Sequence, residues 1–205
     1  DGIRDRDVTG VQTCALPISA ARAQSPAPVA TDAGATTTTA GAAVSPATAS
    51  VRVLVMLVSG VDLDAGTFDA TFYLSIDCPS GCDLDGWEVV NAVSTTVETT
   101  GGTATSRWWR VRGRFVFEPD LHRYPFDTQR LPLRIERVNE PADELLLVAD
   151  TAGSGTDAEL HVPGWSIGPF EASERVHEYP VLGTAYSQVA FAIPLERDAL
   201  ANILK

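Results

Sequence analysis

Residues 120–131 read Asp120-Leu121-His122-Arg123-Tyr124-Pro125-Phe126-Asp127-Thr128-Gln129-Arg130-Leu131. An aromatic residue followed by proline favours a cis peptide bond, which folds the chain back sharply in a type VI turn. The turn lies between two segments in which apolar and polar residues alternate, so we expect it to join two β-strands. Phe126 would then project from a loop tip beside the Asp127 carboxylate. An apolar side chain on an exposed tip indicates a surface that docks against a partner.

The strands on either side of this turn are each predicted to have one apolar face. In the strand before the turn, large apolar residues alternate with arginines. The apolar set is Trp109, Val111, Phe115 and Phe117, and the opposite set is Arg110, Arg112 and Arg114. In the strand after the turn, the predicted inward set is Leu131, Leu133 and Ile135, and the predicted outward set is Arg130, Arg134 and Glu136. Strands of this kind bury their apolar faces against a second sheet.

From Val51 onward, strand-length segments recur with Gly, Pro, Asp and Asn between them. No helical period persists for three turns. We predict strands over 51–59, 67–77, 87–98, 107–118, 129–137, 144–149, 165–177 and 186–197. Short strands with one apolar face each predict an all-β domain built as a β-sandwich.

The turn Tyr124-Pro125-Phe126-Asp127 resembles the Pro-loop of pentameric ligand-gated ion channels, the superfamily of the Cys-loop receptors and their bacterial relatives. Four further segments resemble strands of this family: Val51–Val58 the first, Phe68–Leu74 the second, Gly164–Ile167 the start of the ninth, and Phe191–Arg197 the last. The resemblance implies an immunoglobulin-like twisted β-sandwich, the family's ligand-binding domain, over residues 51–198. Residues 199–205 would then begin the first transmembrane helix.

The resemblance also implies a gating-coupling surface at the end of the domain that faces the membrane. Its residues would be Tyr124, Pro125, Phe126 and Asp127 of the turn, Arg197 of the last strand, and Asp62 and Asp64 between the first two strands. Asp127 and Arg197 would form one interfacial ion pair, and Phe126 would dock between transmembrane segments. A partly desolvated ion pair is sensitive to the loss of either partner. The alternative is a solvated aspartate in a tight turn, where aspartate is common.

At the other end, the resemblance implies a small-molecule ligand between neighbouring subunits, beneath the loop that joins the last two strands. Tyr179 and Tyr186 resemble the two tyrosines of that loop, and Trp108 would be an aromatic residue at the rim. Aromatic faces bind ammonium groups through their quadrupole. The aromatic residue of another binding loop is not found, since Val138-Asn139-Glu140-Pro141 occupies that region. The alternative is that both tyrosines only frame a hairpin with Gly183-Thr184 at its tip.

The three arginines of the strand before the turn also have two interpretations. Arg110, Arg112 and Arg114 could contact an anionic ligand across the subunit boundary, or they could form a solvated face that pairs with neighbouring carboxylates.

The cysteines distinguish this chain from animal members of the family. Those receptors bracket the Pro-loop with a disulfide, whereas Phe117 and Leu131 stand at the two positions here, and bacterial members lack the disulfide too. Cys78 and Cys82 instead flank a Pro-Ser-Gly turn. In an exported protein they could close a small disulfide loop, with free thiols as the alternative.

The two ends of the chain are interpreted separately from the sandwich. Residues 1–18 resemble the translation of a common sequencing adapter, and we exclude them from fold reasoning, with a genuine polar leader as the alternative. Residues 19–50 are predicted to be a signal-peptide remnant and a disordered lead-in rich in Ala, Thr and Pro.

Composition excludes several classes of function. The chain has 205 residues and a formal net charge of −12, which argues against binding to nucleic acid. The three histidines, His122, His161 and His177, lack metal-ligand spacing, and Gly153-Ser154-Gly155 lacks a nucleophile-elbow pattern. We therefore expect no enzyme activity, no cofactor and no metal.

These observations lead to one functional expectation and two alternatives. The expectation is the extracytoplasmic (periplasmic) ligand-binding domain of a bacterial channel, a homopentamer held in the cell membrane by helices that follow Lys205. The alternatives are a β-sandwich sensor domain of another membrane receptor, such as a kinase or cyclase, and a secreted binding domain.

Overall fold

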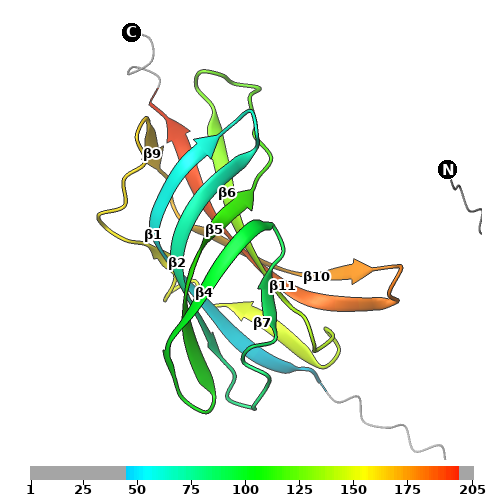
Figure 1. Ribbon diagram of the computed structural model, residues 1–205. Coiled ribbons are helices and arrows are strands. Elements are labelled where there is room, and N and C mark those ends of the chain that lie inside the picture. Colours follow the sequence, from blue (N-terminus) through cyan, green and yellow to red (C-terminus); the bar gives the residue numbers. More distant parts are fainter. Residues whose placement is uncertain (1–44, 199–205) are drawn as a thin grey trace, which may run out of the picture. The chain divides into compact units, whose positions relative to one another are not determined.

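The computed structural model describes residues 45–198, which form eleven β-strands and no helix (Figure 1). The strands are β1 (Ala47–Asp62), β2 (Thr67–Asp77), β3 (Trp87–Val89), β4 (Ala92–Gly102), β5 (Ser106–Val116), β6 (Thr128–Arg137), β7 (Leu145–Ala149), β8 (Gly155–Thr156), β9 (Trp165–Ile167), β10 (Glu171–Tyr179) and β11 (Thr184–Arg197). The all-β prediction is confirmed. The predictions for residues 1–18, for 19–44 and for 199–205 lie outside the described residues.

The strands form two sheets in a sandwich-like arrangement. The six-stranded sheet has the order β4-β5-β2-β1-β7, with β8 beside β1. The five-stranded sheet has the order β10-β11-β6-β3, with β9 beside β11. Within the first sheet, β1 pairs in parallel with β7 and β8, and its pairing with β2 is antiparallel.

The core lies between the sheets and contains the side chains that the alternation predicted to be inward. The buried apolar residues of β5 and β6 include Trp109, Val111, Phe115, Leu131, Leu133 and Ile135. Phe68 of β2 joins this set, and its ring centroid lies 5.6 Å from that of Phe115 and 5.9 Å from that of Phe117. Burying an aromatic side chain of this kind stabilises the fold by about 1.5–3 kcal/mol.

A bulge in β1 explains why its apolar residues change period. Val51, Val53 and Val55 are fully buried, and the next buried valine is Val58. The register against β2 shifts between Val55 and Leu57. The extra residue leaves Leu57 half exposed and returns Val58 to the core.

The predicted strand 87–98 is in fact two strands in different sheets. β3 pairs with β6, and β4 pairs with β5, so the chain crosses from one sheet to the other at Asn91. The buried Asn91 side chain donates hydrogen bonds to the carbonyls of Val116 (2.9 Å) and Pro132 (2.8 Å) and accepts one from the Arg134 amide (3.0 Å). The Asn91 side-chain amide thus satisfies three backbone groups where the chain passes from one sheet to the other. The alternation of apolar and polar residues does not predict this role.

Three other boundaries differ from the prediction. The lead-in predicted to reach residue 50 ends earlier, because β1 begins at Ala47 and its first residues pair with β7. Residues 165–177 are divided between β9 and β10. The short strand β8 was not predicted, since two residues carry no period. In each case pairing with a distant strand, rather than local composition, sets the limit.

Cys78 and Cys82 are joined by a disulfide just after β2. Cys78 is fully buried, and its amide donates a 2.7 Å hydrogen bond to the Thr105 carbonyl beside the β4–β5 connection. The disulfide therefore closes a small loop that is attached to the six-stranded sheet.

Candidate functional site

The turn between β5 and β6 has the geometry expected from its sequence. The Tyr124–Pro125 peptide bond is cis. The Phe126 amide donates a 2.7 Å hydrogen bond to the Arg123 carbonyl, which closes the turn. The side chains of Tyr124 and Phe126 remain 64% and 63% exposed. Two aromatic residues therefore stand on the outside of a turn whose backbone is fixed.

Asp127 does not stand at the tip beside Phe126, and this corrects the sequence interpretation. Its residue exposure is only 2%, because the carboxylate turns inward to the last strand. Arg197 donates from Nε to Oδ1 (2.6 Å) and from Nη2 to Oδ2 (2.9 Å). Gln129 Nε2 donates a third hydrogen bond to Oδ2 (2.7 Å). These donors, the Arg197 hydrogen bond above all, lower the pKa of the Asp127 carboxyl below its ordinary value, although burial acts in the opposite direction.

The Arg197 guanidinium is also enclosed by aromatic rings. It lies 4.3 Å from the ring centroid of Trp165 in β9 and 5.1 Å from that of Tyr124 in the turn. The hydrogen bond with Asp127 raises the pKa of Arg197 above its ordinary value. Sequence reasoning used Trp165 only to mark the start of a strand. Its cation–π contact could not be predicted from local sequence, because Trp165 and Arg197 are 32 positions apart and become neighbours only through the pairing of β9 with β11.

The β1–β2 turn lies at the same end of the fold (Figure 1). Asp62 Oδ1 accepts hydrogen bonds from the amides of Asp64 and Ala65, both 2.9 Å long, so Asp62 stabilises its own turn. A hollow of about 640 Å³ is lined by Asp62, Asp64, Tyr124 and Arg197. Within residues 45–198, neither aspartate makes an ion pair with Arg197, whose partner is Asp127. We call this region the proline-turn end: residues 119–127, the β1–β2 turn, Trp165 and Arg197.

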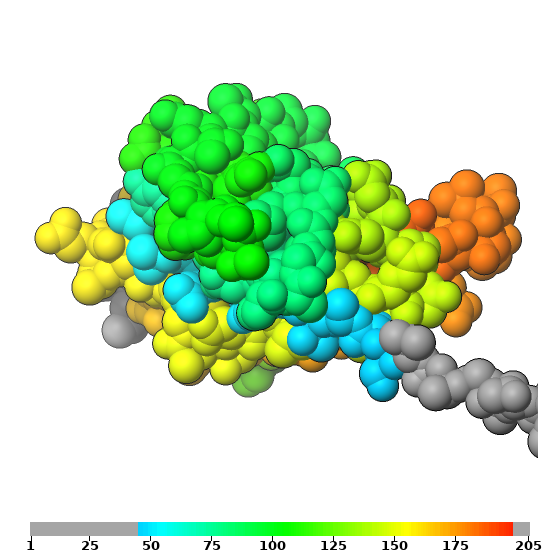
Figure 2. Space-filling view, turned by 90° about the horizontal axis from the view of Figure 1, so that it is seen from below, coloured from blue at the N-terminus to red at the C-terminus, as the bar shows by residue number. Residues whose placement is uncertain are grey.

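The two predicted ligand-binding tyrosines meet on the β10–β11 hairpin. The ring centroids of Tyr179 and Tyr186 are 5.9 Å apart, and that of His177 lies 4.5 Å from Tyr179. The end of this hairpin, orange in Figure 2, extends beyond the other strands of its sheet. Its tip carries Val181 and Leu182, which are 98% and 67% exposed.

Glu136 was predicted to face solvent, and this prediction is wrong. The residue is 2% exposed, because side chains of β10 and β11 cover it. Tyr179 Oη donates to Oε1 and Gln188 Nε2 donates to Oε2, both at 2.6 Å. Among the described residues no lysine or arginine forms an ion pair with Glu136, although pairs of this kind occur elsewhere in the fold. The carboxylate is thus buried with neutral donors only.

We call this group the tyrosine cluster: Glu136, His177, Tyr179, Tyr186 and Gln188. The hydrogen bond to the Glu136 carboxylate, with burial as a smaller cause, raises the pKa of Tyr179 to about 12. The phenol therefore stays protonated and continues to donate at neutral pH. An anionic group beside aromatic faces can hold a cation through charge and through the ring quadrupole together.

Trp108 belongs to the other sheet, in β5, and is 39% exposed. The structure does not bring it into the tyrosine cluster within one chain. Its neighbours Arg110 and Arg114 have partners on the same face. Arg110 bonds the Tyr73 hydroxyl (Nε–Oη 3.1 Å) and lies 3.9 Å from Glu98, and Arg114 makes a two-bond ion pair with Asp69.

No model of a known protein family matches this chain, and no curated protein matches it either. Within residues 45–198 there is no helix of the length and hydropathy needed to cross a membrane. The same residues contain no group of three or more His, Cys, Asp or Glu side chains arranged to hold a metal ion. The site is therefore interpreted from its own geometry.

Proposed function

We propose that this chain is the extracytoplasmic ligand-binding domain of a bacterial pentameric ligand-gated ion channel, with the immunoglobulin-like twisted β-sandwich of that family. In this proposal five copies surround a pore, a small molecule binds between neighbouring copies, and the proline-turn end transmits the binding to membrane helices that follow residue 205. A ligand that binds the open state more tightly than the closed state then shifts the population toward open.

The observation that supports the proposal most is the Asp127–Arg197 ion pair. Two hydrogen bonds of 2.6 and 2.9 Å attach the turn to the end of the last strand. The attached turn leaves Tyr124 and Phe126 exposed, although apolar side chains gain nothing from contact with water. A rigidly held pair of exposed aromatic residues suits a surface that moves as one body with β11 and docks against membrane segments.

The tyrosine cluster supports a cationic ligand for the same protein. The Glu136 carboxylate is 2% exposed and makes no ion pair within the described residues, and Arg175 reaches it only through Gln188, to whose Oε1 the Arg175 Nε donates (2.7 Å). A buried carboxylate without an ion pair is unfavourable, so a site of this kind favours a cation from outside. We propose that the ligand is a small amine whose ammonium group lies against Tyr179 and Tyr186 and is attracted by Glu136.

The test is a flux experiment on the protein encoded by the complete reading frame. The proposal requires four apolar segments of about 20 residues after Lys205. The purified protein should form pentamers, and in liposomes it should pass ions when a primary or quaternary amine is added. A reading frame with a stop codon at this point, or with one span followed by a cytoplasmic enzyme domain, would support the secreted or sensor alternative instead.

A further inference from the structure

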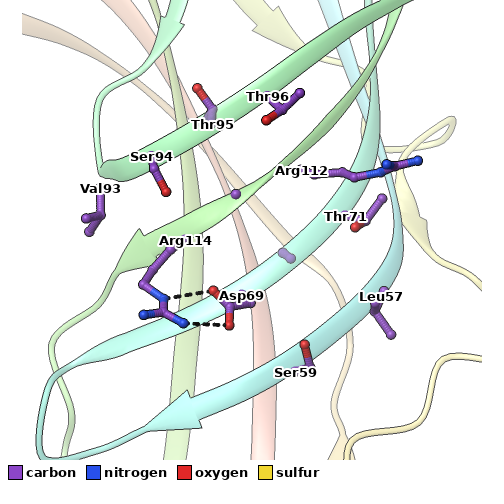
Figure 3. A pocket seen from close by; sticks show the side chains of 12 residues that line it. Leu57, Ser59, Asp69, Thr71, Val93, Ser94, Thr95, Thr96, Arg112 and Arg114 are labelled. Atoms are coloured by element: carbon purple, nitrogen blue, oxygen red, sulfur yellow. Dashed lines mark hydrogen bonds and ion pairs between the residues drawn. The ribbon is translucent and has the colours of Figure 1, made fainter.

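The outer face of the six-stranded sheet contains a second candidate binding site, separate from both regions described above. A hollow of about 520 Å³ lies across β1, β2, β4 and β5. Two of these strands have a register shift at the hollow, between Val55 and Leu57 in β1 and between Ala92 and Ser94 in β4, and such bulges bend the strand that carries them. We call it the arginine hollow, after Arg112 and Arg114, which line it (Figure 3).

The two arginines of the hollow differ in their partners. Arg114 donates from Nε and Nη2 to the Asp69 carboxylate at 2.9 and 3.0 Å, so its charge is balanced (Figure 3). Arg112 is exposed and makes no ion pair or side-chain hydrogen bond among residues 45–198, in contrast to its neighbours Arg110 and Arg114. The hollow therefore has one unbalanced positive charge in a chain whose net charge is −12.

Two threonines flank Arg112 in the sheet. Arg112 is the direct cross-strand partner of Thr71 on β2 and of Thr96 on β4. Residues opposite each other in a ladder share a face and lie about 5 Å apart, so both threonines stand beside the arginine. Ser59 and Ser94 line the same hollow, and the only contacts drawn among its side chains join Arg114 to Asp69 (Figure 3). Apart from the Arg114–Asp69 pair, the polar groups of the hollow are thus one guanidinium and several hydroxyls, each of which can donate a hydrogen bond.

The rim of the hollow is apolar. Leu57 is 50% exposed and Val93 is 60% exposed. A guanidinium binds a carboxylate through two parallel hydrogen bonds, and one unbalanced positive charge matches one negative charge. The apolar rim can contact a short alkyl group but offers nothing to a second negative charge.

We propose that the arginine hollow binds a small monocarboxylate, with the carboxylate on Arg112 and the threonine hydroxyls and the alkyl group against Leu57 or Val93. The site is a different surface from the tyrosine cluster and takes a ligand of the opposite charge. Carboxylate binding at the arginine hollow requires neither a pore nor an amine. If the hollow does not bind a carboxylate, the proposed function is therefore unaffected.

The test is a titration of the 205-residue chain with sodium propionate at constant ionic strength, followed by calorimetry and by the amide NMR signals of β2, β4 and β5. We expect saturable binding in the millimolar range, with shifts centred on residues 71, 96 and 112. Arg112→Gln should weaken propionate binding by on the order of tenfold, since the positive charge and the paired N–H donors of the guanidinium are both lost. Arg112→Lys should bind propionate with an affinity between those of the wild-type protein and Arg112→Gln. If Arg112→Gln does not fold, the comparison of Arg112→Lys with the wild-type protein tests the site.

Arg134→Gln is the matched control, because Arg134 is also exposed but lies on β6 in the other sheet. Binding that is retained in this control and lost in the Arg112 variants supports the proposal. Linear, non-saturating shifts, or equal losses in Arg112→Gln and Arg134→Gln, would overturn the site. Sulfate that competes as well as propionate would overturn the preference for a monocarboxylate.

Discussion

Tyr186 and Arg197 lie near opposite ends of one continuous strand, β11. The strand has 14 residues, and at about 3.3 Å per residue it is about 45 Å long. Tyr186 belongs to the tyrosine cluster, whereas Arg197 holds the proline turn through Asp127. A strand paired with β6 and β10 along its length is a stiff connection, so a shift at one end can reach the other without passing through a loop.

The Asp127–Arg197 pair should contribute strongly to stability. Asp127→Asn would leave the Arg197 guanidinium without its charged partner in a site where that side chain is 13% exposed. We expect a loss of about 3 kcal/mol in the free energy of unfolding, as for other buried pairs that lose one member. Urea denaturation of the two proteins measures this difference in the free energy of unfolding. Asp69→Asn is the matched control, because the Asp69–Arg114 pair is exposed, and its effect should be much smaller.

The same pair predicts the response to acid. The pKa of Asp127 is lower in the folded state than in the unfolded chain, so its stabilising effect is complete above about pH 4 and is lost as the pH falls through the folded value. The free energy of unfolding should therefore fall with decreasing pH below about 4. Asp127→Asn should show a shallower fall, and identical acid profiles for the two proteins would contradict this assignment.

Tyr179 predicts the opposite behaviour in base. Its folded pKa of about 12 lies above the ordinary value of 10.0, so its contribution is complete below pH 10 and is lost as the pH rises toward 12. Tyr179→Phe should remove this part of the alkaline destabilisation. The phenolate absorbance of the wild-type protein should include a component that titrates near pH 12, and the variant should lack this component.

Glu136→Gln should separate stability from ligand binding. The substitution removes a buried charge that has only neutral donors around it, so the unliganded chain should unfold at the same or a higher denaturant concentration. Amine binding should fall by at least about tenfold, which corresponds to about 1.4 kcal/mol. Glu178→Gln, at the neighbouring hairpin, is the control for a general change of charge. A strong loss of stability in Glu136→Gln would mean that the carboxylate is a structural element.

The sequence alone predicted the all-β fold class, and it predicted which side chains of β5 face the core. Both predictions succeeded because a strand with one buried face alternates apolar and polar residues. Trp109 and Arg112 fall on the expected sides for this reason. Glu136 is an exception to the alternation, because it is a polar residue of β6 that is buried. Tyr179 covers it from β10, two strands away in the sheet. The coverage depends on the sheet order, which no local pattern contains.

The candidate site was predictable to a similar extent. The cis bond before Pro125 follows from local chemistry, whereas the inward direction of the Asp127 carboxylate depends on where β11 ends. Trp165 and Gln129 complete the surroundings of the pair, and their roles follow from packing alone. Long-range contacts of this kind are the part of the site that a single sequence does not determine.

The most direct test of the channel proposal compares ligand binding with ion flux in the full-length protein carrying Phe126→Ala. Phe126 is 63% exposed and lies outside the ion pair, so the substitution should leave both stability and amine affinity unchanged. Val97→Ala, another exposed apolar change, on β4 (47% exposed), controls for the loss of a surface side chain. The account predicts that Phe126→Ala binds the amine normally but loses most of the amine-evoked flux. Normal binding together with normal flux would contradict it.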